Sequence, residues 1–268
     1  MSDSDMTAPA VRGAVVAEIG WQRVDGSVRG SVHTPLIIDG IPGLALTYAD
    51  LPVAEELANA RRVAVVLTDA RKTLRGWQPM VATGPPPELE HDPEGERFLA
   101  QDDLVGQELA KYPPSRLRSD SLLQRGENWW YQSRVLARFV GLSPSLCPEA
   151  RTNPDDGVLL YAVDHRLTAE TVRVDDWHAD RLRIEPLAGT APAPRQPSPA
   201  CLLRHDHSDD LERRATFTLT GRWDGDRFTV ATREGQAHLP PVPGVWARIK
   251  QAKALERACR RGLRAAGH

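Results

Sequence analysis

Residues 43–69, GLALTYADLPVAEELANARRVAVVLTD, decide the fold of this chain. The stretch begins with a short β-rich segment and continues with good helix formers, for which Asp50 is a candidate N-cap and Pro52 suits the first turn. It ends with RVAVVLTD at 62–69, an unbroken apolar run that predicts a strand buried on both faces. We therefore expect a strand, a short helix and a buried strand in succession.

The flanking sequence predicts more strands. Upstream, AVVAEIGW at 14–21 and SVRGSVHTPL at 27–36 lie on either side of an Asp-Gly turn signal. Downstream, QPMVATGPPPELEH at 78–91 is extended in pattern, but it contains three consecutive prolines at 85–87. Proline cannot donate a hydrogen bond to a neighbouring strand, so this segment must bend there or lie at a sheet edge.

The rest of the chain mixes helical and extended patterns. Helices are predicted at 93–112, 115–130 and 246–265, and strands at 134–142, 158–163, 171–174, 181–187, 215–222 and 227–232. The expected fold class is therefore mainly β with flanking helices (α+β).

Composition narrows the functional classes. The 268 residues carry a formal net charge of −2, so no overall field draws the protein to nucleic acid or to a membrane. No apolar stretch approaches the length of a membrane span. The three cysteines, Cys147, Cys201 and Cys259, form neither a metal-binding spacing nor a disulfide framework. Because the N-terminus also lacks the pattern of a signal peptide, a cytoplasmic location is expected.

The order of these elements resembles a known family. A strand ending in TP, a strand ending in TY, a helix, RRVAVVLTD and then VATGPPPELEHDPE is similar to the flavin-binding split barrels of the pyridoxamine 5′-phosphate oxidase-like superfamily. The match covers about residues 14–114 and continues more loosely to about residue 187. The resemblance implies an antiparallel split β-barrel, a homodimer, and a cofactor at the subunit interface. That cofactor is usually flavin mononucleotide (FMN), with a deazaflavin or haem as alternatives.

The resemblance also implies positions for the cofactor. In the family the phosphate contacts the end of the third strand and the following helix, a basic position precedes the fourth strand, and a cleft lies beside SVHTPL. The cofactor-binding residues expected on this basis are Thr47, Tyr48, Arg61, Arg62 and His33. The family commonly carries a lysine near the start of the helix, where this chain has Val53, and Asp50 adds a negative charge beside it. The favoured alternative for His33 is a purely structural role, as a histidine held by a hydrogen bond within a strand.

Combining these patterns predicts four parts. A flexible tail occupies 1–12, a split-barrel domain 13–188, and a linker, GTAPAPRQPSP, 189–199. A C-terminal hairpin and a basic helix, 200–268, are expected to pack on the barrel. LLYAVDH and the Trp177 region resemble LLRHDH and the Trp223 region, which either a duplicated hairpin or chance would explain.

Three clusters have both a functional and a structural interpretation. The sequence His205-Asp206-His207 could present two imidazoles to a metal, but a solvated turn is favoured and no metal site is expected. Near Trp130, core packing is favoured over a ligand-stacking wall, and surface pairing is favoured for Arg134. The last helix is basic, and a solvated helix with Trp246, Ile249, Leu255 and Leu263 on its buried side is favoured over a nucleic-acid face.

Two function classes follow from the resemblance. One is a flavin- or deazaflavin-dependent oxidoreductase acting on a small molecule, in which the cofactor performs the hydride chemistry. The alternative is a cofactor-free or haem-binding member of the fold that binds a small molecule or another protein. No catalytic residue is assigned from the sequence.

Overall fold

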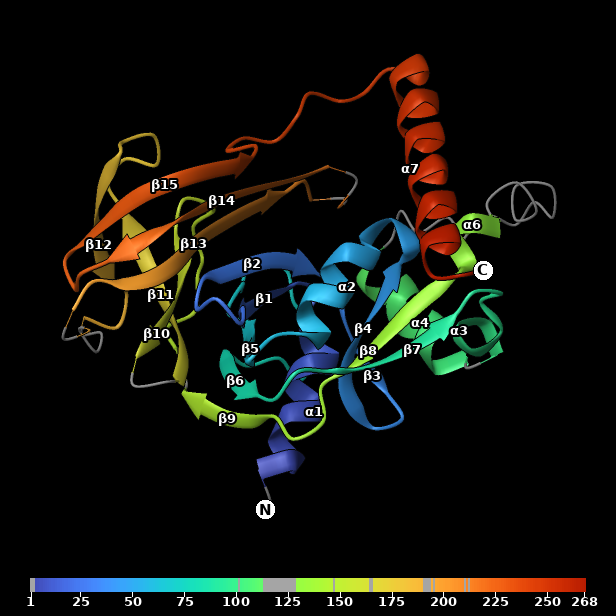
Figure 1. Ribbon diagram of the computed structural model, residues 1–268, viewed down its shortest axis with the longest axis horizontal. Coiled ribbons are helices and arrows are strands. Elements are labelled where there is room, and N and C mark those ends of the chain that lie inside the picture. The colour runs from blue at the N-terminus through green and yellow to red at the C-terminus, as the bar shows by residue number, and fades with distance from the viewer. Residues whose placement is uncertain are drawn as a thin grey trace.

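The computed structural model describes residues 3–100, 102–112, 129–146, 148–163, 166–189, 194, 196–209, 211 and 213–268. Within these residues the strands pair antiparallel in three sheets, and helices flank them (Figure 1). The first sheet has the order β2-β1-β5-β6-β9 and the second the order β3-β4-β8-β7. The third group closes on itself in the order β10-β11-β12-β15-β14-β13. The predicted class, mainly β with flanking helices, is therefore confirmed.

The elements have the following bounds. The two open sheets contain β1 (Ala17–Gln22), β2 (Val28–His33), β3 (Pro35–Ile38), β4 (Ile41–Thr47), β5 (Arg62–Leu67), β6 (Met80–Gly84), β7 (Glu88–Asp92), β8 (Arg134–Arg138) and β9 (Ser143–Leu146). The closed barrel contains β10 (Gly157–Val163), β11 (Arg166–Val174), β12 (Arg181–Pro186), β13 (Ser198–His207), β14 (Arg214–Trp223) and β15 (Arg227–Gly235). The helices are α1 (Asp3–Gly13), η1 (Tyr48–Asp50), α2 (Leu51–Ala58), α3 (Glu96–Ala100), α4 (Asp102–Lys111), α6 (Trp129–Gln132) and α7 (Val245–Ala265).

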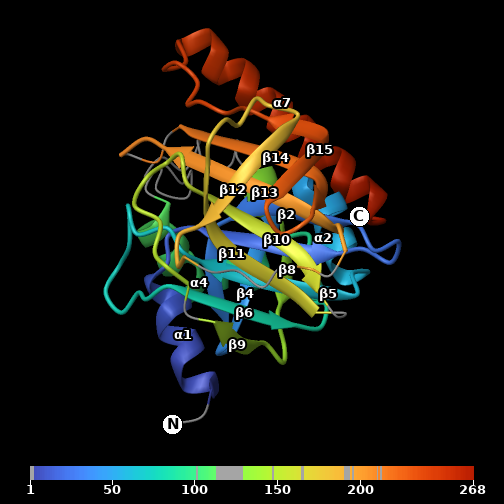
Figure 2. The same ribbon diagram turned by 90° about the vertical axis from the view of Figure 1, so that its left-hand side faces the viewer.

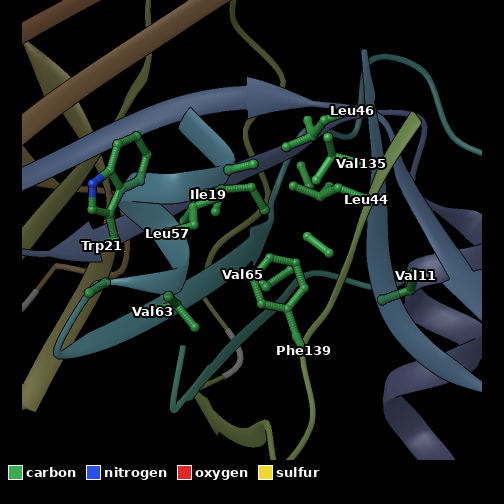
Figure 3. Packing of buried hydrophobic residues seen from close by; sticks show 14 of the residues in the cluster. Val11, Ile19, Trp21, Leu44, Leu46, Leu57, Val63, Val65, Val135 and Phe139 are labelled. Atoms are coloured by element: carbon green, nitrogen blue, oxygen red, sulfur yellow. The ribbon is translucent and has the colours of Figure 1, made fainter. Parts of the chain in front are cut away.

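The main hydrophobic core lies between the two open sheets. Ile19, Val65 and Leu57 project into it from β1, β5 and α2, and Leu44 and Val135 come from β4 and β8 (Figure 3). The apolar run at 62–69 thus forms the buried strand that the sequence predicts, since every residue of β5 after its first is buried. The helix following β4 also lies where it is predicted.

A second core joins the closed barrel to the first sheet. Gly20 of β1 pairs with Gly30 of β2, and the side chain of Leu160 from β10 lies directly over both. A Cβ atom built on Gly20 would lie 2.6 Å from a Leu160 methyl carbon, so any larger residue here would force the Leu160 side chain to move. The barrel is therefore packed on the outer face of the first sheet.

The closed barrel consists of two similar three-stranded halves, β10–β12 and β13–β15. The sequence similarity aligns Leu159 with Leu202 and Leu182 with Phe228. The halves meet at two seams, the β10–β13 pair and the β12–β15 pair, and Leu159 pairs with Leu202 in the first and Leu182 with Phe228 in the second. Equivalent residues meet in this way when two copies are related by a two-fold axis through both seams. The two halves are thus arranged symmetrically, and each half closes the open edges of the other.

Several sequence expectations differ from the structure. Residues 3–13 form α1 instead of a loose tail, because Ala10 and Val11 are fully buried in the main core. Strands β10 and β12, before the predicted linker at 189–199, pair with β13 and β15, so the linker does not separate two independent sheets. The chain at 198–207 forms strand β13, which is not among the predicted strands. Of the helix predicted at 115–130, residues 115–128 lie outside the described part of the chain.

Candidate functional site

The candidate site is a cleft where the second sheet, helix α4 and the closed barrel meet. Its volume is about 160 Å³. We call it the central cleft, and its lining residues come from both open sheets, from three helical segments and from β14. They are Val32, His33, Thr34, Leu36, Ala45, Leu46, Thr47, Asp50, Glu108, Tyr112, Tyr131, Arg134 and Arg214.

One wall of the central cleft is a neutralised ion pair. The buried guanidinium of Arg134 lies 3.4 Å from Glu108 Oε1, and Tyr131 donates a hydrogen bond of 3.0 Å to the same oxygen. Arg134 also stacks between the rings of Phe98 and Tyr131, with its guanidinium carbon 4.3 Å and 4.5 Å from the ring centroids. The surface pairing predicted for Arg134 is therefore wrong, because this cation is paired inside the protein.

Arg214 brings a positive charge into the cleft whose hydrogen-bond donors are largely unused. Its guanidinium carbon lies 4.6 Å from the ring centroid of Tyr112, but its Nε and Nη2 atoms are buried without a hydrogen-bond partner. Among the described residues no carboxylate lies within ion-pair distance of it. Burial lowers the pKa of Arg214 from its usual value, yet arginine stays protonated in proteins. A buried cation with unused donors is costly, and an anion in the cleft would relieve that cost.

His33, at the end of β2, also lines the cleft. Its Nε2 atom is 2.8 Å from Ser31 Oγ. Burial lowers the pKa of His33, with Asp50 opposing this effect and Arg214 adding to it, so the imidazole is neutral at pH 7. Thr47 Oγ1 donates a hydrogen bond of 3.0 Å to Asp50 Oδ2, which satisfies that carboxylate locally. A neutral imidazole and a threonine hydroxyl thus complete the polar lining.

The structure brings together only some of the predicted cofactor residues. His33 and Thr47 both line the central cleft. Tyr48 is completely buried beside it, and its hydroxyl lies 3.3 Å from His91 Nδ1. Arg61 and Arg62 are exposed at the start of β5 and do not line the cleft. Arg214, Glu108 and Tyr112 also line the cleft, and no local sequence motif marks them.

The predicted phosphate position does not fit FMN. Helix α7 covers the end of β4, since a Cβ atom on Gly262 would lie 1.9 Å from the carbonyl oxygen of Tyr48. Asp50 places a carboxylate there, and Val53 replaces the lysine of the family. A phosphate at this position would meet the Asp50 carboxylate and would lack the family's lysine, which forfeits the charge-assisted hydrogen bond that this lysine supplies.

A second polar cluster joins the barrel to the first sheet. We call it the Glu18 network: the buried carboxylate of Glu18 contacts Arg151 Nη2, and its Oε1 lies 2.6 Å from His205 Nε2. Arg151 also donates to Thr68 Oγ1 at 3.0 Å and to the carbonyl of Asp156 at 3.2 Å. Desolvation lowers the pKa of His205, although Glu18 opposes this effect.

The network continues toward the surface through a second pair of residues. Asp69 forms a bidentate pair with Arg71 at 2.7 and 2.9 Å, and His207 Nε2 lies 3.3 Å from Asp69 Oδ2. The solvated turn predicted for 205–207 is wrong, because these residues end strand β13 and His205 is buried. In the part of the chain that the structure describes, no three histidine, cysteine or acidic side chains are grouped so as to hold a metal ion.

Comparisons with known proteins give little support for any function. No family model matches the chain, and no curated protein matches it. A protein of unknown function from Agrobacterium tumefaciens strain C58 is similar in structure, with a TM-score of 0.32 and 18% identity over 55% of this chain and 59% of that one. A haem-binding protein from Mycobacterium smegmatis has a TM-score of 0.32 and 12% identity, over 97% of this chain and 98% of that one. Both similarities are too low to support a shared fold or function. Among the described residues, no helix has the length and apolarity needed to cross a membrane.

Proposed function

We propose that this protein binds a small monoanionic molecule with an apolar body, such as an aromatic carboxylate, in the central cleft. The observation behind this proposal is Arg214, a buried guanidinium that lines the cleft with two nitrogen atoms unused. A carboxylate presents two oxygens at the spacing of a guanidinium edge, so it is the anion that matches these donors best.

The pairing of charges in the cleft limits the ligand to a single negative charge. Glu108 neutralises Arg134, and His33 is neutral at pH 7. Asp50 accepts the hydrogen bond of Thr47 and keeps its negative charge, so the lining carries two carboxylates and two guanidinium groups. Arg214 is the one of these two cations with no carboxylate within ion-pair distance among the described residues, although the charge of Glu108 acts on it from farther away.

The size and the apolar lining favour a compact ligand. Pockets that enclose drug-sized molecules have volumes of about 300–1,000 Å³, and the central cleft has about 160 Å³. Leu36, Leu46 and Val32 offer apolar contact, and Tyr112 and Tyr131 offer ring surfaces. A molecule the size of one aromatic ring with a carboxylate suits this space better than a flavin or a haem.

The finer fold assignment belongs to the same proposal. We infer an antiparallel split barrel of the pyridoxamine-phosphate-oxidase-like kind, formed by the two open sheets around one core. The strand order, the helix between β4 and β5, and the proline interruption between β6 and β7 support it. In this proposal the chain keeps the scaffold of the flavin proteins without their phosphate site.

Titration calorimetry with benzoate as the probe tests the proposed site. We expect benzoate to bind and benzamide, which has nearly the same shape without the charge, to bind far more weakly. Arg214→Met should weaken benzoate binding by about tenfold or more, because one charge-assisted contact contributes roughly 1.5–3 kcal/mol. Arg222→Met, on the same strand but outside the cleft, is the matched control and should bind benzoate like the natural protein.

Two results would overturn the proposal. Equal affinities for benzoate and benzamide would mean that Arg214 does not recognise the charge. Stoichiometric uptake of FMN or a deazaflavin, seen in the absorption spectrum, would favour the oxidoreductase instead, and a Soret band after haemin addition would favour haem binding.

A further inference from the structure

A serine and a histidine on β2 form a pair that the proposed function does not use. Ser31 and His33 are two positions apart on this strand, so their side chains lie on the same face of the sheet. Ser31 Oγ and His33 Nε2 are 2.8 Å apart, which is hydrogen-bond distance. A hydroxyl at this distance from an imidazole nitrogen is the arrangement by which a histidine activates a serine as a nucleophile.

The position of β2 makes this pair reachable from the central cleft. β2 is the edge strand of the first sheet, and it lies beside β13 and β14 of the closed barrel (Figures 1 and 2). His33 lines the cleft, and Ser31 is half-buried next to it. A molecule that fills the cleft therefore contacts His33 directly, with the Ser31 hydroxyl one hydrogen bond farther away.

The charges around His33 suit a general base. Because burial lowers its pKa, the imidazole is neutral at pH 7 and its Nε2 atom can accept a proton. The Asp50 carboxylate, which lines the same cleft, acts in the opposite direction and stabilises the imidazolium that forms when His33 takes that proton. The unused donors of Arg214 suit an oxygen atom that becomes negative during a reaction.

We propose that the central cleft hydrolyses small esters of aromatic carboxylic acids, with Ser31 as the nucleophile and His33 as the general base. This inference rests on the proposed function, because the carboxylate that Arg214 binds is then the product of the reaction. The aromatic acyl group occupies the cleft, whose volume of about 160 Å³ suits one ring. Since Ser31 is not part of the lining, the ester carbonyl lies at the edge of the cleft beside His33.

The reaction proceeds in two steps. Ser31 Oγ attacks the ester carbonyl carbon while its proton passes to His33 Nε2, and Arg214 holds the oxygen that becomes negative. The bond from this carbon to the alcohol oxygen then breaks, and His33 gives its proton to the departing alcohol. Water attacks the acyl-serine, and His33 takes a proton from the water and returns it to Ser31 Oγ as the acyl–serine bond breaks. One ester and one water thus give an alcohol, a carboxylate and a proton.

Hydrolysis of 4-nitrophenyl benzoate, followed by the release of nitrophenolate, tests this activity. We expect the natural chain to turn the ester over repeatedly and to be inhibited by benzoate. Ser31→Ala and His33→Gln should each lower the rate by about a hundredfold or more, because each removes the proton transfer. Ser27→Ala is the matched control, since this hydroxyl bonds to Asp25 in the β1–β2 turn, and it should hydrolyse the ester like the natural chain.

Covalent labelling gives a second measurement that does not depend on turnover. Phenylmethanesulfonyl fluoride transfers its sulfonyl group to an activated serine oxygen, with loss of fluoride and of the hydroxyl proton. Trypsin cleavage after Arg29 and Arg61 gives a peptide, residues 30–61, in which Ser31 is the only serine. Mass spectrometry should find the sulfonyl group on this peptide from the natural chain, and not on the same peptide from His33→Gln.

Calorimetry with benzoate separates this inference from the proposed function. Benzoate binding to a natural chain that is neither labelled at Ser31 nor hydrolytic would overturn the inference and leave the proposed binding site intact. Hydrolysis that Ser31→Ala and His33→Gln leave unchanged would also overturn it, because the hydrogen bond between these residues would then be structural only. Labelling at Ser31 and hydrolysis that depends on it, without benzoate binding, would support the reaction and overturn the assignment of Arg214 to the carboxylate.

Discussion

Replacing Glu18 by Gln is expected to lower the free energy of unfolding by about 3–5 kcal/mol, the range found when one partner of a buried ion pair is removed. Glu18 is completely buried, and its carboxylate is the counter-charge of Arg151, which is also buried. Glutamine has nearly the same shape, so the substitution removes the charge without opening a cavity. The cost arises because Arg151 would keep its positive charge in the interior without a carboxylate.

Chemical denaturation of the natural chain and the variant, followed by circular dichroism, measures this loss. Glu234→Gln is the matched control, because it breaks the Arg29–Glu234 pair on a surface where the carboxylate side chain is 67% exposed. That control should change stability by less than about 1 kcal/mol. If both substitutions had the same small effect, the Glu18 network would not hold the barrel to the first sheet.

The part of the fold that the sequence predicts well is the part with a clear local pattern. Residues 43–69 form a strand, a helix and a buried strand as expected, because their turn signals and apolar periodicity agree with their final contacts. The three prolines at 85–87 separate β6 from β7 for the reason given from the sequence. Strand β13 was not predicted, since the charged residues at 204–207 hide an extended segment that is stabilised by pairing with β10 and β14.

The central cleft was predictable only in part. His33 and Thr47 were found because they lie in the segment that resembles a known family, whereas Arg214 enters the cleft from the closed barrel. No spacing along the chain connects residues so far apart. The Glu18 network shows the same limit, because the two ends of its hydrogen bond, Glu18 and His205, are separated by 187 positions.

The amphipathic pattern of α7 identified an apolar stripe but not what covers it. Periodicity reports that one face of a helix avoids water, and it gives the same signal for a face buried within one chain and for a face buried between chains. Leu263 belongs to the first case, as its burial in the main core shows. Trp246 and Ile249 carry the same periodic signal and are exposed in the single chain, so periodicity alone does not decide burial.

Lys111 has an unusual environment for one of only four lysines in the chain. Its ammonium group is buried and donates hydrogen bonds of 2.6 Å to the carbonyl oxygens of Val11 and Pro35, which ties α4 to α1 and β3. Burial lowers the pKa of Lys111 to about 7, with a further contribution from Arg12 that Asp103 opposes. The folded protein therefore releases this proton near neutral pH, whereas the unfolded chain keeps it up to its ordinary pKa of 10.5.

Stability is accordingly expected to rise with pH just above neutrality. Between the two pKa values only the unfolded chain binds the proton, so raising the pH removes a preference for unfolding, and below the folded pKa the effect is constant. From about pH 7.5 to about pH 9, Lys111 should add roughly 2 kcal/mol to the free energy of unfolding. Lys111→Met keeps the apolar stem and removes the titration, so denaturant unfolding of this variant should lack that increase. Remaining below about pH 9 limits the contribution of the buried Cys201 thiol, whose pKa burial raises to about 12. Parallel pH profiles for the natural chain and Lys111→Met would show that Lys111 is charged in the folded protein, with its hydrogen bonds to α1 and β3 compensating for burial.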